Sequence, residues 1–143
     1  MQHYKIGILF YFLLFIFGCT ASEPPKFLFD VVVENTSSQA FTLTLAYPNE
    51  LQYQERFEPG DRNVICQYIS ESFFGISPEC SSIATIEFDN GKGYRCDRSL
   101  TFVEDTLCFE NRELLVQLGY RQEGESTYTF TINEDHFLNA NDL

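Results

Sequence analysis

The stretch that decides the fold class is TYTFTI at residues 127–132, in which threonine alternates with a large apolar residue at every step. A period of two places successive side chains on opposite faces of a strand. The β-branched and aromatic residues of this stretch are also the residues that are enriched in strands. The stretch therefore predicts a strand with one face in a core and the other toward water.

The same alternation recurs along the chain and is interrupted by residues that favour turns. Asn90-Gly91 is a strong hairpin signal because such turns need positive φ, and Pro59-Gly60 fits a type II turn. Residues 100–110 suggest at most an edge strand. Asn133 is placed to cap a short helical turn near the C-terminus. The alternating stretches cover residues 27–34, 41–47, 51–57, 63–69, 84–88, 94–98 and 114–120.

Seven to nine short strands without a long helix predict an all-β domain. We expect an antiparallel sandwich of two sheets, Ig-like in the loose sense, with a small closed barrel as the alternative. The tryptophan that packs inside antibody domains has no counterpart, because the chain contains no Trp. The expected organisation is a leader at residues 1–18, a short tether at residues 19–26 and one domain at residues 27–143.

The leader has the pattern of a lipoprotein signal peptide. A polar start with one lysine precedes an apolar run at residues 6–17, which is too short to span a membrane. The run ends in IFGC at residues 16–19, which resembles a bacterial lipobox, although Phe17 is bulkier than the usual residue at its place. The resemblance implies that a diacylglycerol is attached to the sulfur of Cys19 and that the chain is cleaved just before this residue.

The residues after Cys19 form the tether and bear on localisation. Pro24-Pro25 favours extended polyproline geometry, so the tether spans on the order of 20 Å. Thr20 stands where an aspartate would resemble an inner-membrane retention signal, and we therefore expect the outer membrane, on its periplasmic side or at the cell surface. Ordinary signal cleavage after Ala21, which gives a soluble secreted protein, is the alternative.

The charge of the chain restricts its partners. One of the nine basic residues lies in the leader, so the mature part carries eight against 21 acidic residues, a net charge near −13. Such a field repels phosphate backbones, and we expect no nucleic-acid partner. It also repels anionic lipid head groups, so attachment to a membrane depends on the lipid on Cys19.

Four cysteines remain after the lipidated one, and in an exported chain they predict two disulfides. We favour the pairs Cys66–Cys80 and Cys96–Cys108 among the three pairings, because each closes a loop between two strands. A loop of about 15 residues stabilises the fold by about 3 kcal/mol in the chain-entropy model. The gaps between successive cysteines hold 13, 15 and 11 residues, whereas zinc ligands come in closely spaced pairs, so we expect no metal and no cofactor.

No catalytic motif stands out. His136 is the sole histidine after the leader and is expected at the surface, and the chain has no G-x-S-x-G sequence. The best candidate for a partner contact is Phe73-Phe74 in the polar loop at residues 70–81. Alternation cannot direct both rings into a core, and aromatic residues are enriched at interfaces. The competing interpretation is that both rings cap the open end of the sandwich.

Several short motifs support a resemblance. They are residues 128–132, Glu134-Asp135, Asn139-Ala140, the hairpin at residues 88–92 and the lipobox. In these motifs, about a third of its length, the chain resembles a broad group of uncharacterised small lipoproteins from Bacteroidota. The resemblance implies a β-sandwich lipoprotein and supplies neither an activity nor site residues.

These features favour a lipid-anchored, non-enzymatic binding module of the cell envelope with an unknown protein or glycan partner. A protective inhibitor of a host or competitor enzyme such as lysozyme is the alternative, since an acidic surface suits a basic enzyme. A carbohydrate-active hydrolase is the third hypothesis, because the abundant carboxylates could supply a catalytic pair.

Overall fold

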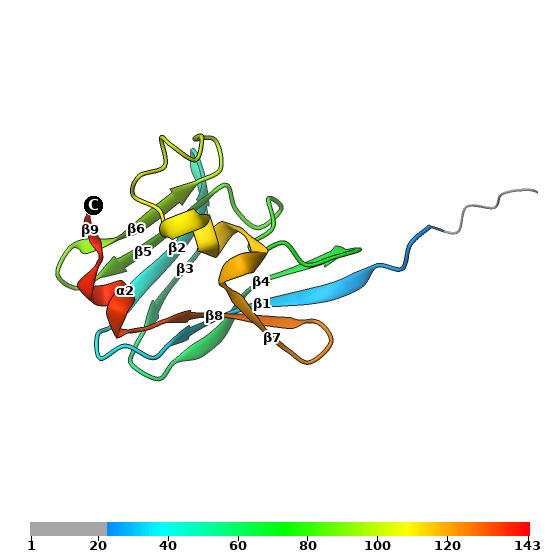
Figure 1. The fold of residues 1–143 in the computed structure, drawn as a ribbon, viewed down its shortest axis with the longest axis horizontal. Coiled ribbons are helices and arrows are strands. Elements are labelled where there is room, and N and C mark those ends of the chain that lie inside the picture. The colour runs from blue at the N-terminus through cyan, green and yellow to red at the C-terminus, as the bar shows by residue number, and fades with distance from the viewer. Residues whose placement is uncertain (1–22) are drawn as a thin grey trace, which may run out of the picture.

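The computed structural model describes residues 23–143, so the predicted leader and Cys19 lie outside the described residues. The described chain forms two stacked sheets (Figure 1). The strands are β1 (Phe27–Asn35), β2 (Phe41–Tyr47), β3 (Glu50–Phe57), β4 (Arg62–Ser70), β5 (Ile83–Phe88), β6 (Lys92–Asp97), β7 (Tyr120–Glu123), β8 (Thr127–Ile132) and β9 (Asn141–Asp142). The helical turns are η1 (Glu110–Leu115), η2 (Gln117–Gly119) and α2 (Glu134–Leu138).

The sheets are ordered β4-β1-β8-β7 and β3-β2-β5-β6-β9 and remain separate. The predicted two-sheet sandwich is therefore confirmed, and the closed barrel is not formed. One pair departs from the expected antiparallel arrangement, because β1 and β8 run parallel, with Val31 opposite Tyr128. Between β1 and β8 the chain forms strands β2, β3, β5 and β6 of the other sheet. These residues provide the long connection that a parallel pair needs.

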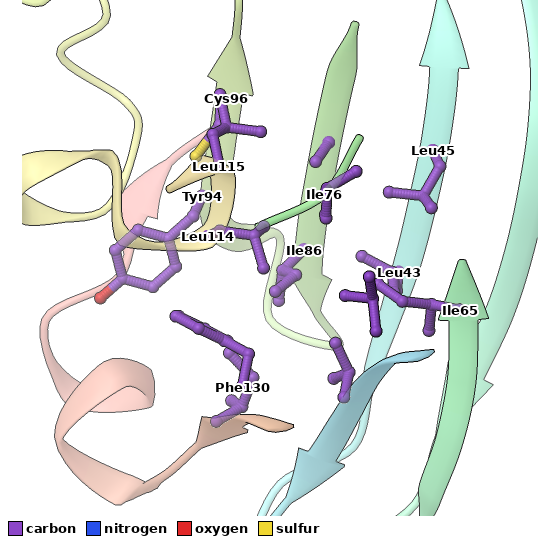
Figure 2. Close-up of a cluster of buried hydrophobic side chains, with 14 of the residues drawn as sticks. Leu43, Leu45, Ile65, Ile76, Ile86, Tyr94, Cys96, Leu114, Leu115 and Phe130 are labelled. Atoms are coloured by element: carbon purple, nitrogen blue, oxygen red, sulfur yellow. The ribbon is translucent and has the colours of Figure 1, made fainter. Parts of the chain in front are cut away.

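The core lies between the two sheets. The apolar face of TYTFTI is buried as predicted, since Tyr128, Phe130 and Ile132 are all inside. Thr129 is buried on the opposite face, where its hydroxyl lies 3.1 Å from both Arg62 Nη2 and Glu123 Oε2. Figure 2 shows core side chains from both sheets, among them Leu43, Leu45, Ile65, Ile86, Tyr94, Cys96 and Phe130, meeting between the layers. Ile76 from a loop and Leu114 and Leu115 from η1 join the same cluster.

The turn and disulfide predictions are confirmed. Gly60 and Gly91 have positive φ, and the turn at Gly91 joins β5 to β6. The side chain of Asn133 caps α2. The cysteines pair as favoured, with Cα atoms 6.0 Å apart in Cys66–Cys80 and 4.4 Å apart in Cys96–Cys108.

The strand expected at residues 114–120 is wrong for most of its length. The chain forms the turns η1 and η2 there, and a strand, β7, begins only at residue 120. Leu114 and Leu115 are neighbours and both buried, which a strand with one buried face cannot achieve. Asn111 and Arg112, both at left-handed φ, turn the chain so that both leucines enter the core. Residues 100–110 also contain no strand.

Gly75 gives a stability prediction. It has φ 89°, and a Cβ at this position would lie 2.8 Å from the backbone of Leu115. We expect Gly75→Ala to lower the free energy of unfolding by about 2 kcal/mol, because both the left-handed φ and the close contact oppose a side chain. Urea denaturation measures this loss.

Gly60→Ala is the matched control, because Gly60 has φ 92° and nothing lies within 4 Å of its added Cβ. Only the backbone cost of about 1 kcal/mol remains there. Equal losses in the two variants would show that the contact between Gly75 and Leu115 contributes nothing.

Candidate functional site

The structure separates the two aromatic residues that the sequence analysis selected. Phe73 is 4% exposed, and its ring stacks on Tyr128 with the centroids 3.7 Å apart. Its side chain therefore belongs to the core, which corrects its assignment to a contact surface. Phe74 is 37% exposed and lies against Tyr68, whose hydroxyl oxygen accepts a hydrogen bond from the Phe74 amide at 3.1 Å. A partner contact through Phe74 remains a prediction.

The loop closed by the second disulfide presents more apolar surface. We call residues 97–109 the braced loop; it continues from the end of β6 and lies at the top of Figure 1. Phe102 is 62% exposed and Val103 is 82% exposed, with Leu100 partly exposed beside them. Three large apolar side chains within four residues thus face solvent. Single exposed apolar residues are normal on protein surfaces, whereas a contiguous group of them marks a candidate interaction site.

Covalent and local hydrogen bonds hold this loop in one shape. Cys96–Cys108 closes it, and the Arg95 amide donates to the Leu107 carbonyl at 2.9 Å. Within the loop, Glu104 Oε2 accepts hydrogen bonds from the amide and the hydroxyl of Thr101, at 3.0 and 2.7 Å. The side chain of Glu104 therefore bridges back to Thr101 and encloses the segment that carries Phe102.

A buried ion pair fixes the base of the braced loop. Arg112 Nη2 lies 3.0 Å from Asp105 Oδ2, with the side chains 18% and 2% exposed. The Asp105 carboxylate also accepts from the Asp97 amide at 3.1 Å. Arg112 donates to the carbonyl oxygens of Asp97 and Leu100 as well, at 3.2 Å for the latter. One arginine thus connects both ends of the loop to η1.

Arg98 joins the braced loop to the first disulfide loop. Its guanidinium donates to the carbonyl oxygens of Ile76 and Leu115, at 3.2 Å for the latter. Burial, together with the nearby charge of Arg112, lowers the pKa of Arg98, although a guanidinium stays protonated in proteins. Its hydrogen bonds to the carbonyls therefore persist at any working pH, and the two loops are held together.

The braced loop itself suits recognition of a protein better than capture of a small molecule, although larger hollows of about 330 and 520 Å³ lie elsewhere on the described domain. The hollow at the base of the braced loop, beside Asp97 and Leu107, measures about 90 Å³, far below the 300 Å³ or more of typical ligand pockets. Exposed aromatic side chains on a rigid support form the centres of many protein interfaces, since little side-chain and loop entropy is lost on binding.

His136 is half-buried rather than at the surface as expected. Its Nδ1 accepts a hydrogen bond from the Asn133 amide at 3.1 Å, and its own amide donates to Asn133 Oδ1 at 3.1 Å. Its ring lies edge-on to Phe109, with the centroids 5.3 Å apart. Burial lowers the pKa of His136, partly opposed by Asp135. The imidazole therefore completes a helix cap in its neutral form.

This cap makes the stability depend on pH. Above about pH 7.5 His136 is neutral in both the folded and the unfolded chain, whose histidine pKa is about 6.5. As the pH falls through this value the unfolded chain takes up a proton and the folded chain resists it, so the free energy of unfolding falls. The loss levels off below the lowered pKa of the folded state.

His136→Gln retains a side-chain acceptor at this position of the cap and removes the titration. We expect urea denaturation between about pH 7.5 and 5.5 to show a smaller loss of stability in the variant than in the wild type. Parallel pH dependences would exclude His136 as the titrating group.

Carboxylates gather in a hollow of about 330 Å³ beside His136. Glu110, Glu113 and Asp135 line it together with Tyr94 and Phe109. Within residues 23–143 no three side chains of His, Cys, Asp or Glu are placed to hold a metal ion. The hydrolase hypothesis, which rests on the abundance of carboxylates and on no particular pair, remains a prediction.

Comparison with known proteins identifies no relative, since no protein-family model, no curated protein and no solved structure matches the chain. The resemblance to small lipoproteins accordingly remains a prediction. Within the part of the chain that the structure describes, no helix has the length and apolar character needed to cross a membrane.

Phe102 and Val103 are exposed apolar residues that the sequence analysis did not single out. The available signal was the same as for Phe73-Phe74, namely two adjacent large apolar residues in a polar loop beside a cysteine. Sequence alone assigns neither pair to the core or to the surface. The packing of Phe73 against Tyr128 and the absence of any stacked ring against Phe102 among the described residues decide between them.

Proposed function

We propose that this protein is a lipid-anchored, extracytoplasmic binding module that holds a partner protein on the braced loop. The observation that carries the proposal is the exposure of Phe102 and Val103 on a loop fixed by a disulfide and a buried ion pair. A flexible loop would lose entropy on binding, whereas this loop is already ordered.

The anchor and the compartment have independent support. Two disulfides are typical of oxidising compartments outside the cytoplasm. The lipobox-like residues 16–19 supply the site of lipid attachment at Cys19, and the outer membrane is the expected location. A protein held at a membrane in this way needs no enzymatic activity to recruit or block a partner.

The charge indicates the kind of partner. With a net charge of −12 over the whole chain, the protein attracts basic proteins and repels acidic ones, chiefly through the rate of association. We expect a basic partner with an apolar depression that accepts Phe102. The Phe102 ring is the expected centre of the contact, since aromatic residues dominate the binding energy of many interfaces.

Site-specific photo-crosslinking in the producing cell tests the proposal. A photoreactive phenylalanine derivative at position 102 should give one discrete adduct with a partner protein. The same group at Leu51 is the matched control, because this residue is similarly exposed but lies on β3, with β2 and β5 between it and β6, from which the braced loop continues. Adducts of equal yield at both positions, or none at position 102, would contradict the proposed contact.

Inhibition of an enzyme is a second candidate function, and the rigidity of the braced loop favours it. A loop that keeps its shape can occupy an active-site cleft without being reorganised, and the acidic charge suits a basic enzyme such as lysozyme. An assay of lysozyme activity distinguishes this role. No inhibition at micromolar protein would remove lysozyme as the target, while the photo-crosslink would still report a different partner.

A further inference from the structure

The end of the sandwich nearest the tether carries a second exposed apolar surface. Leu28 is 54% exposed and Ile69 is 65% exposed, and the two face each other across β1 and β4. Phe27, also half-exposed, precedes Leu28 and points to the opposite face of the strand. We call Phe27, Leu28 and Ile69 the anchor-proximal patch.

This patch lies on a two-stranded extension of the four-stranded sheet. Residues 27–29 pair with β4 alone, because the pairing of β1 with β8 begins at Asp30. Figure 1 shows this ribbon reaching out on the side where the tether leaves the domain. Apolar side chains therefore project from both faces of a protruding ribbon. This shape suits insertion into the interfacial region of a bilayer more than packing against the flat surface of another protein.

The length of the tether restricts what can cover the patch. Seven residues separate Cys19 from Phe27, so the end of β1 lies within about 28 Å of the lipidated residue even when the chain is fully extended. The patch is thus the part of the described domain that is held closest to the acyl chains. A bilayer is accordingly the surface that the chain itself brings to the patch.

Charges of both signs lie near the patch, since Glu71 and Glu125 line a hollow beside Phe27. Lys26 directly precedes Phe27 and is exposed, and a lysine of this kind can reach the head groups while its stem lies along apolar surface. The net charge of −12 repels anionic head groups. The contact is therefore expected with zwitterionic head groups, after the anchor has overcome the general repulsion.

We propose that the anchor-proximal patch contacts the interfacial region of the bilayer that anchors the protein and thereby orients the domain. This inference rests on the proposed lipidation of Cys19. The contact keeps the braced loop, which lies apart from this ribbon in Figure 1, clear of the membrane and accessible to its partner.

The absence of tryptophan from the chain allows a direct test. Ile69→Trp places a single fluorophore in the patch, more than 40 residues along the chain from the tether, and Phe102→Trp places one on the braced loop as the control. The full lipidated protein is reconstituted into phosphatidylcholine vesicles whose acyl chains carry bromine. We expect quenching about threefold stronger for Ile69→Trp than for Phe102→Trp, because only the first reaches the acyl boundary.

A second substitution separates the patch from the tether. Leu28→Asp in the Ile69→Trp protein should abolish the extra quenching, whereas Leu51→Asp, at an exposed leucine of β3, should leave it intact. Equal weak quenching at positions 69 and 102 in protein that floats with the vesicles would overturn the patch and leave the anchor standing. Protein that does not float contradicts the anchor itself. The tryptophan at position 69 could instead become less accessible to water as the ratio of protein to lipid rises, without being quenched by the brominated chains. That result would show that a second copy covers the patch.

Discussion

Replacing Cys19 with serine is expected to move nearly all of the protein from the membrane fraction to the soluble fraction. A serine hydroxyl does not accept the diacylglycerol that a lipobox cysteine receives, so the leader is removed by ordinary cleavage after Ala21 and the domain is released without an anchor. One acyl chain binds a membrane only marginally and two or more hold it stably. The net acidic charge of the domain repels anionic head groups and does not compensate for their loss. Cell fractionation followed by immunoblotting measures the shift.

The matched control is Ser22→Ala, which alters the tether and leaves residues 16–19 intact, and it should remain with membranes. On a non-reducing gel the Cys19→Ser protein should keep the disulfides Cys66–Cys80 and Cys96–Cys108, because the domain folds without the anchor. Membrane association of the serine variant would remove the main support for lipidation. A wild-type protein that is itself soluble would favour cleavage after Ala21 instead.

Replacing Asp105 with alanine is expected to lower the free energy of unfolding by about 3 kcal/mol, because it leaves the Arg112 guanidinium buried without its counter-ion. The same change removes the acceptor for the Asp97 amide at the base of the braced loop. A loss of this size is a large share of the 5–15 kcal/mol by which most domains are stable. Urea denaturation followed by far-ultraviolet circular dichroism measures it.

Two comparisons define the cause of this loss. Asp89→Asn removes a carboxylate from an exposed pair with Arg56, and it should change the stability far less. The double variant Asp105→Leu with Arg112→Met replaces both charges by apolar groups and should recover most of the loss, since the cost arises from the unpaired charge. If Asp105→Ala and Asp89→Asn have equal effects, the buried pair does not stabilise the braced loop.

The same variants connect stability to binding. The loop in the Asp105→Leu, Arg112→Met protein regains stability but lacks the hydrogen bonds from Arg112 to the Asp97 and Leu100 carbonyls. Its photo-crosslink from position 102 should therefore be weaker than in the wild type even after the fold is restored. This outcome would separate the shape of the loop from the stability of the domain.

Much of the fold follows from local patterns in the sequence. The alternation in TYTFTI predicted β8, the Asn90-Gly91 turn predicted the β5–β6 hairpin, and Asn133 predicted the cap of α2. These features depend on residues a few positions apart, where side-chain period and backbone φ preferences act directly. Both disulfides were predictable for a related reason, because each joins the two ends of one loop.

Other features depend on residues far apart in the sequence. The alternation of Leu114, Val116 and Leu118 is the same signal that identifies true strands, yet the left-handed turn at Asn111 and Arg112 directs the chain into 3₁₀ turns. The parallel pairing of β1 with β8 joins strands that are almost a hundred residues apart, and a strand's own pattern does not specify its neighbour.

By itself the sequence determined an all-β sandwich with two disulfides, together with the prediction of a lipid anchor, since periodicity, turn residues and cysteine spacing are local properties. The tertiary structure decided which apolar residues remain at the surface. Phe73 became core because Tyr128 and Phe29 come to it from other strands, whereas Phe102 has no such neighbours in the described fold and stays exposed. Burial depends on contacts between distant segments, and no local pattern contains that information.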